Sequence, residues 1–124
     1  MIERLEFDAV PVGTIGTFVI GTLTNVNPAL RFVVYETGVI KGIGNWTTPP
    51  QLSIGTNAIA NSLMVTQNLT IIPLRGRNES EPTIWAFPSG TDIRLRVTAA
   101  GVVSAGVPLV DAYIIGIWTD ITSV

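Results

Sequence analysis

Few side chains in this sequence can perform acid–base or nucleophilic chemistry. The chain has no histidine and no cysteine. This removes the usual general base near neutral pH and both the Ser-His-Asp and Cys-His arrangements. Two carboxylate pairs remain as candidates for a hydrolase, Glu79 with Glu81 and Asp111 with Asp120. Glu79 and Glu81 lie in a polar segment that favours solvated carboxylates, so no catalytic residue is predicted.

Ligand motifs are equally scarce. The glycine pairs Gly13-x-x-Gly16 and Gly42-x-Gly44 neither follow a strand nor open a helix, and the lysine of a phosphate-binding loop is missing after both. Without cysteine and histidine the chain lacks the commonest ligands of zinc. We therefore expect no cofactor and no metal.

The three tryptophans differ in their surroundings. Trp85 and Trp118 fall in strand-like patterns and are expected in the core. Trp46 follows Gly44-Asn45 and precedes Thr47-Thr48-Pro49-Pro50, which predicts a loop. A loop tryptophan can stack on a sugar ring, anchor a protein interface or cover the end of the core. All three roles stay open for Trp46.

Other features point to protein interfaces. The segment 98–108 is uncharged and rich in small residues, which permits close backbone approach, as around a symmetry axis. Arginine is used far more than the single lysine, Lys41, and it suits planar pairing with carboxylates of a neighbouring strand or subunit. The interface candidates are therefore Trp46, Arg75, Arg77, Arg94, Arg96, Val102, Val103 and Val107.

The composition sets the class of protein. Charged residues make up 13% of the chain, against about 25% in ordinary globular proteins. Residues 9–30 and 42–74 carry no charge at all, and the mean hydropathy is +0.48. A net charge of −2 without a basic stripe argues against nucleic acid and against an anionic membrane surface. Partner proteins that cover much of the surface would explain the missing charge.

Membrane insertion and secretion are not expected. The best apolar stretch, residues 102–118, contains Pro108 and Asp111, whereas a spanning helix needs about 18 apolar residues. Residues 1–6 lack the basic and apolar regions of a signal peptide.

Strand patterns dominate the chain. Period-two alternation is clearest in residues 91–99, where Ile93, Leu95 and Val97 are expected inward and Arg94 and Arg96 outward. Thr37-Gly38 predicts a turn. Further strands are predicted at 14–23, 30–36, 39–43, 51–54, 63–67, 69–74, 83–87 and 112–119, with loops at 44–50 and 100–107. We expect one all-β domain, residues 1–124, an antiparallel β-sandwich of roughly eight strands, with residues 1–8 as an edge strand or an N-terminal arm.

The pattern of the chain, which includes the segments TDIRLRVTAAG and DAYIIGIWTDI, resembles the small jelly-roll decoration or cement proteins of tailed-bacteriophage capsids. This resemblance implies a jelly roll without enzymatic activity that forms an oligomer, often a trimer. It also implies that the protein is made in the host cytoplasm, binds the major capsid protein and stiffens the shell from the capsid surface. The charged residues 3–8 would then be a natural arm for contacting the shell.

A capsid cement protein is the leading functional hypothesis. Burial of uncharged surface between subunits would be its mechanism, with the arginines setting the register. The alternative is a carbohydrate-binding module or lectin-like domain that uses Trp46, with Tyr35 or Tyr113, as a stacking platform. A phage tail or fibre domain would differ only in its partner.

Overall fold

The fold consists of antiparallel strands. The computed structural model describes residues 2–43, 46–56, 63–68, 74–76 and 86–120, and these contain strands and no helix. The eleven strands are β1 (Ile2–Pro11), β2 (Gly16–Thr22), β3 (Arg31–Ile43), β4 (Trp46–Thr48), β5 (Gln51–Thr56), β6 (Met64–Asn68), β7 (Leu74–Gly76), β8 (Ala86–Pro88), β9 (Asp92–Ala99), β10 (Val102–Val103) and β11 (Leu109–Thr119).

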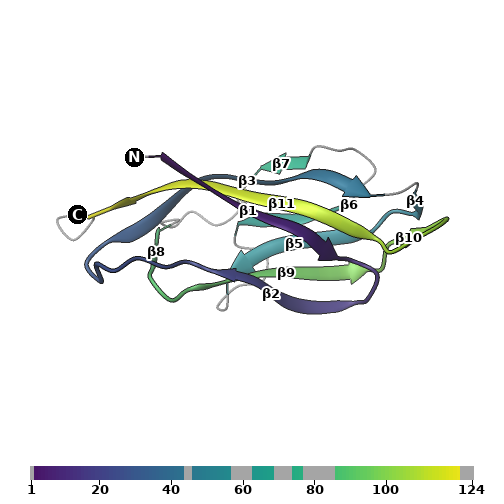
Figure 1. Ribbon diagram of the computed structural model, residues 1–124, viewed down its shortest axis with the longest axis horizontal. Coiled ribbons are helices and arrows are strands. Elements are labelled where there is room, and N and C mark those ends of the chain that lie inside the picture. Colours follow the sequence, from purple (N-terminus) through teal and green to yellow (C-terminus); the bar gives the residue numbers. More distant parts are fainter. Residues whose placement is uncertain (1, 44–45, 57–62, 69–73, 77–85, 121–124) are drawn as a thin grey trace.

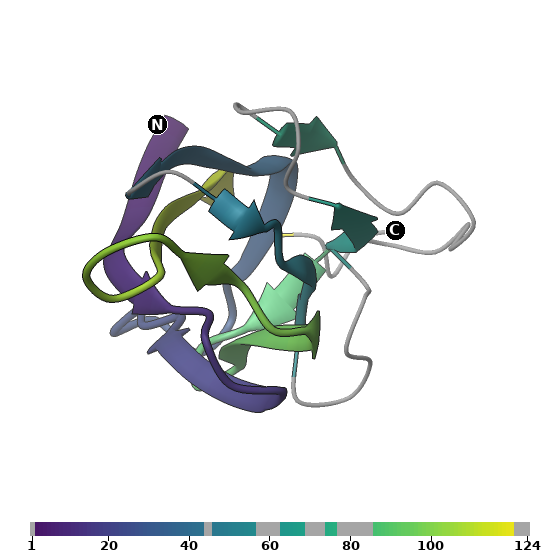
Figure 2. The ribbon, with the colours of Figure 1, turned by 90° about the vertical axis from the view of Figure 1, so that its right-hand side faces the viewer.

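Two sheets face each other (Figures 1 and 2). The first has the order β1-β11-β3-β7, with β8 also pairing with β3, and the second has the order β2-β9-β5-β6. Strands β4 and β10 form a separate two-stranded ribbon. The expected antiparallel β-sandwich is therefore confirmed. The strand number exceeds the expected eight because four of these strands are only two or three residues long.

The core lies between the two sheets. On β9 the predicted alternation is confirmed, because Ile93, Leu95 and Val97 are buried while Arg96 is exposed. Trp118, expected in the core, lies half-buried at its margin with its ring tilted against that of Phe32, the centroids 5.2 Å apart. The buried core cluster consists of Val10, Val12, Leu23, Phe32, Val34, Val39, Leu52, Ile54, Leu63, Ile93, Leu95, Val97, Val110, Ala112 and Ile114.

The turn predicted at Thr37-Gly38 is wrong. Strand β3 runs without interruption through both residues, and Thr37 and Gly38 pair with Ile114 and Tyr113 of β11. Both are fully buried. The strand is central here, with β11 on one side and β7 on the other, and Oγ1 of Thr37 is buried without a hydrogen-bond partner. The two strands predicted at 30–36 and 39–43 are thus one.

The loops predicted at 44–50 and 100–107 also contain strand structure. Val102 pairs with Thr48 and Val103 with Trp46, which forms the short β4–β10 ribbon. Pro49 and Pro50 follow the ribbon directly and end it, as their missing N–H groups require.

Strand β1 is an edge strand, one of the two forms expected for the first residues. It pairs with β11 from Ile2↔Ile117 to Pro11↔Leu109, with a bulge between Phe7 and Val10. Ala9, inside the bulge, has φ +55°, and its N–H donates to a carboxylate oxygen of Asp111 at 2.8 Å. The bulge bends the end of β1 and redirects its side chains.

Candidate interaction surfaces

The carboxylate pairs considered from the sequence do not form a described site. Asp111 lies on β11 and Asp120 just beyond its end, so the extended strand separates them by about 30 Å. Glu79 and Glu81 lie outside the described residues. Within the described ranges, no group of three or more acidic residues is arranged to hold a metal ion. No helix long and apolar enough to cross a membrane occurs there either.

A small polar network links β1, β3 and β11 on the outer face of the first sheet. The Tyr113 hydroxyl donates to Oε2 of Glu36 at 2.7 Å, and the Arg4 guanidinium lies 4.5 Å from the centre of the Tyr113 ring. Arg4 also donates to Glu6 at 2.8 Å. These contacts leave Tyr113 only 1% exposed. Its ring therefore offers no open stacking surface for a sugar.

The β4–β10 ribbon builds one end of the molecule, far from the start of β1 and the end of β11 (Figure 1). Trp46 is half-buried and packs against the core. Its ring also covers Gly101 so closely that a Cβ atom at Gly101 would lie 2.9 Å from the ring and 3.2 Å from Pro50. Trp46 is thus held in place rather than fully free in solvent.

Apolar side chains are exposed at this same end. Val102 is 48% exposed and Val107 61%, while Val103 is half-buried. The N–H of Val12 donates to Pro108 O at 3.0 Å, which joins the β1–β2 connection to this end. No charged residue occurs between Val97 and Val110. We call Trp46, Val102, Val103 and Val107 the uncharged tip.

Two of the four candidate arginines can be placed with their side chains. Arg94 and Arg96 lie on β9, opposite Val19 and Thr17 of β2. Nη2 of Arg94 is 3.6 Å from Oδ2 of Asp92, whereas the Nε atom of Arg94 is buried without a hydrogen-bond partner. Arg75 belongs to β7, and Arg77 and Trp85 lie outside the described residues.

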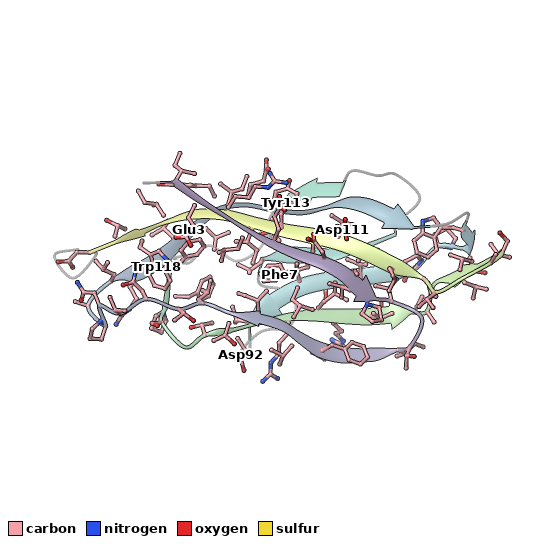
Figure 3. The ribbon with its side chains drawn as sticks, viewed as in Figure 1. Glu3, Phe7, Asp92, Asp111, Tyr113 and Trp118 are labelled. Atoms are coloured by element: carbon pink, nitrogen blue, oxygen red, sulfur yellow. The ribbon has the colours of Figure 1, made fainter. Side chains whose placement is uncertain are left out.

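A groove that the sequence analysis missed runs between β1 and β2. It has a volume of about 500 Å³, and its apolar floor includes Phe7 and Phe18. Phe7 reaches from β1 toward the second sheet (Figure 3). The full lining is Glu6, Phe7, Asp8, Val10, Pro11, Thr14, Phe18, Val19 and Ile20.

Part of the groove could have been recognised from the sequence. Residues 14–23 form a predicted strand without a charged side chain, and Phe18 and Val19 within it are 39% and 54% exposed. An uncharged strand with exposed apolar residues is a candidate for an uncovered edge. The missing information was that this strand lies at the margin of its sheet, beside β1.

Comparison with known proteins gives a likeness of fold. No protein-family model matches the chain, and no curated protein matches it. Among solved structures, a chain titled "Cyanophage Pam1 capsid asymmetric unit" superposes with a TM-score of 0.53 at 13% sequence identity. The superposition covers 93% of this chain and 80% of that chain. At this identity the likeness shows that the two chains share their overall fold.

Proposed function

We propose that this chain is a non-enzymatic structural protein of a phage shell, a decoration or cement protein of the jelly-roll type at the capsid surface. The observation that carries this proposal is the uncharged tip, where Val102 and Val107 expose apolar side chains without a nearby charge in the sequence. The fold shared with a chain of a cyanophage capsid asymmetric unit supports the same class of protein.

The tip would act by burying apolar surface against other subunits. Neighbouring copies, in a trimer, and the major capsid protein are the proposed partners. Trp46 is suited to the centre of such a contact because its ring is already fixed over Gly101 and Pro50 and loses little freedom on binding. Arg94 and Arg96 would set the register by pairing with carboxylates of a neighbour.

Self-association is tested by the solution mass of the purified protein, measured by light scattering after size exclusion at micromolar concentration. We expect a closed oligomer, and we expect Val107→Asp to shift it toward monomer because a charge at the tip would be buried unpaired. Val26→Asp is the matched control, because Val26 is fully exposed on another part of the chain. A monomeric wild type, or equal effects of both substitutions, would contradict association through the tip.

The alternative function is sugar binding through Trp46 and Tyr35, which is 52% exposed. Trp46→Ala separates the two functions. Loss of assembly without any glycan binding by the wild type supports the structural role, whereas loss of glycan binding with unchanged assembly supports a lectin. The thermal midpoint of each variant shows whether it is folded.

A further inference from the structure

The groove between β1 and β2 is bounded by two edge strands. Among the residues that the structure describes, β1 pairs only with β11, and β2 pairs only with β9. Each strand therefore presents one row of backbone N–H and C=O groups that no described strand satisfies. Figures 1 and 2 place both strands along the same side of the sandwich. Within the described part of the chain, the opening between the two sheets thus has unpaired strand edges on both margins.

The two edges differ in their protection against pairing. Strand β1 has a bulge at Asp8-Ala9, ends at Pro11 and carries charged side chains, which are the usual devices that prevent edge-to-edge contact. Strand β2 contains neither proline nor a charged residue. Val19 lies near its middle, exposed beside the groove. Strand β2 is therefore the margin that can accept another strand.

The charge of the groove is negative. Glu6 and Asp8 are the only charged residues in its lining, and both are carboxylates. The nearest cation on β1, Arg4, donates to Glu6 and lies over the Tyr113 ring on the outer face of the sheet. Asp8 is exposed and has no ion-pair partner among the described residues. A basic side chain in the groove would meet Asp8 directly.

We propose that the groove binds an extended segment of a partner protein, which pairs with the free edge of β2 and places a lysine or arginine against Asp8. Apolar side chains on one face of the segment would cover Phe7 and Phe18. Main-chain pairing supplies affinity in such strand additions, and the side chains supply specificity. This site stands apart from the uncharged tip and does not depend on the proposed capsid role.

Other occupants fit the groove less well. A small apolar ligand would fill the volume but would leave the backbone groups of β2 without partners. The acidic β1 of a second copy would bring carboxylates against Glu6 and Asp8, which like-charge repulsion disfavours. An extended segment in which apolar and basic residues alternate would pair with the backbone of β2, cover the apolar side chains of the groove and place a positive charge beside Asp8.

The probe is a dye-labelled, end-capped peptide of the sequence Lys-Val-Thr-Val-Lys-Val-Thr, whose binding to the full chain is followed by fluorescence anisotropy. We compare it with a peptide carrying glutamate in place of lysine and with one N-methylated at alternate residues. We expect both controls to bind about tenfold more weakly, a difference of about 1.4 kcal/mol. The first lacks the basic charge and the second lacks backbone donors. Equal binding by the N-methylated peptide would overturn strand pairing, and equal binding by the glutamate peptide would overturn the charge match.

Two variants locate the binding site. Asp8→Lys should reverse the preference between the lysine and glutamate peptides. Val19→Lys should weaken binding of the lysine peptide, because it adds a like charge beside the groove. Val26→Lys is the matched control outside the groove and should bind like the wild type. Melting curves confirm that each variant is folded. An unchanged preference in Asp8→Lys, or equal binding by Val19→Lys and Val26→Lys, would refute the site, whatever the oligomeric state shows about the tip.

Discussion

The ring of Phe7 on β1 lies directly against the backbone of Gly21 on β2, so the two edge strands touch at this point. A Cβ atom at Gly21 would overlap the ring, which is therefore accommodated only because residue 21 has no side chain. Gly21→Ala should lower the free energy of unfolding by about 1–2 kcal/mol, since the ring must move out of the core margin. Urea unfolding measures the loss. The loss should shrink in a Phe7→Leu background, and an equal loss in both backgrounds would show that the ring is not responsible.

Gly116 should tolerate substitution by alanine less well than Gly21 and Gly106 do. A Cβ atom there would overlap the carbonyl oxygen of Val33 and lie 2.7 Å from the Phe32 ring, so the backbone of β3 itself would have to shift. We expect Gly116→Ala to destabilise the fold by about 3 kcal/mol. Gly106→Ala is the comparison, because Gly106 has open space around it and its φ of +85° costs an alanine only about 1 kcal/mol. A larger loss for Gly106→Ala would contradict this placement of β11 against β3.

Ala9 occupies a conformation that glycine adopts more easily. Its φ of +55° is held by the bulge in β1 and by the hydrogen bond from its N–H to Asp111. Ala9→Gly should raise the thermal midpoint slightly, because relief of about 1 kcal/mol of backbone strain outweighs the added freedom of the unfolded chain. Asp111→Ala should lower the midpoint, whereas Asp111→Asn, which keeps a side-chain oxygen, should lower it less. Identical midpoints for the two Asp111 variants would show that the hydrogen bond contributes nothing.

The Tyr113 hydroxyl should contribute to stability through Glu36. Tyr113→Phe removes the 2.7 Å hydrogen bond but keeps the ring beneath Arg4, so we expect a loss of about 1 kcal/mol. Chemical denaturation of Tyr113→Phe, Glu36→Ala and the double variant gives the coupling energy. Strict additivity of the two single losses would argue against the bond.

The fold class could be predicted because the strands have a strong local signal. In β9 the alternation of Ile93, Leu95 and Val97 with Arg94 and Arg96 predicted both the strand and its buried face. The turn at Thr37-Gly38 failed for the opposite reason. Local turn propensity at these two residues is overridden by pairing with β11, which lies far along the chain and carries no local signal.

The two candidate surfaces, the uncharged tip and the groove, also differ in how far the sequence predicts them. The uncharged stretch that contains Val102 and Val107 was visible in the sequence because it lacks charge over a continuous range, and the structure exposes both side chains. The uncharged strand that forms one side of the groove could be recognised, but the groove itself could not. Asp8 and Val19 line the same groove only because β1 and β2 lie at the margins of different sheets. Strand order of this kind depends on long-range pairing, which no local pattern encodes.

The pairing of β1 with β11 has a consequence for biosynthesis. Ala9 and Asp111 are 102 residues apart in the chain, and β11 is the only described strand with which β1 pairs. While the ribosome is still translating the residues between them, β1 emerges without the strand that will receive it. Closure of such a distant pair is slow, and an unpaired strand is prone to aggregation in the meantime. Strand β1 carries the carboxylates of Glu3, Glu6 and Asp8, whereas most of the chain has no charge. Charges of this kind oppose the aggregation of a strand that has not yet found its partner.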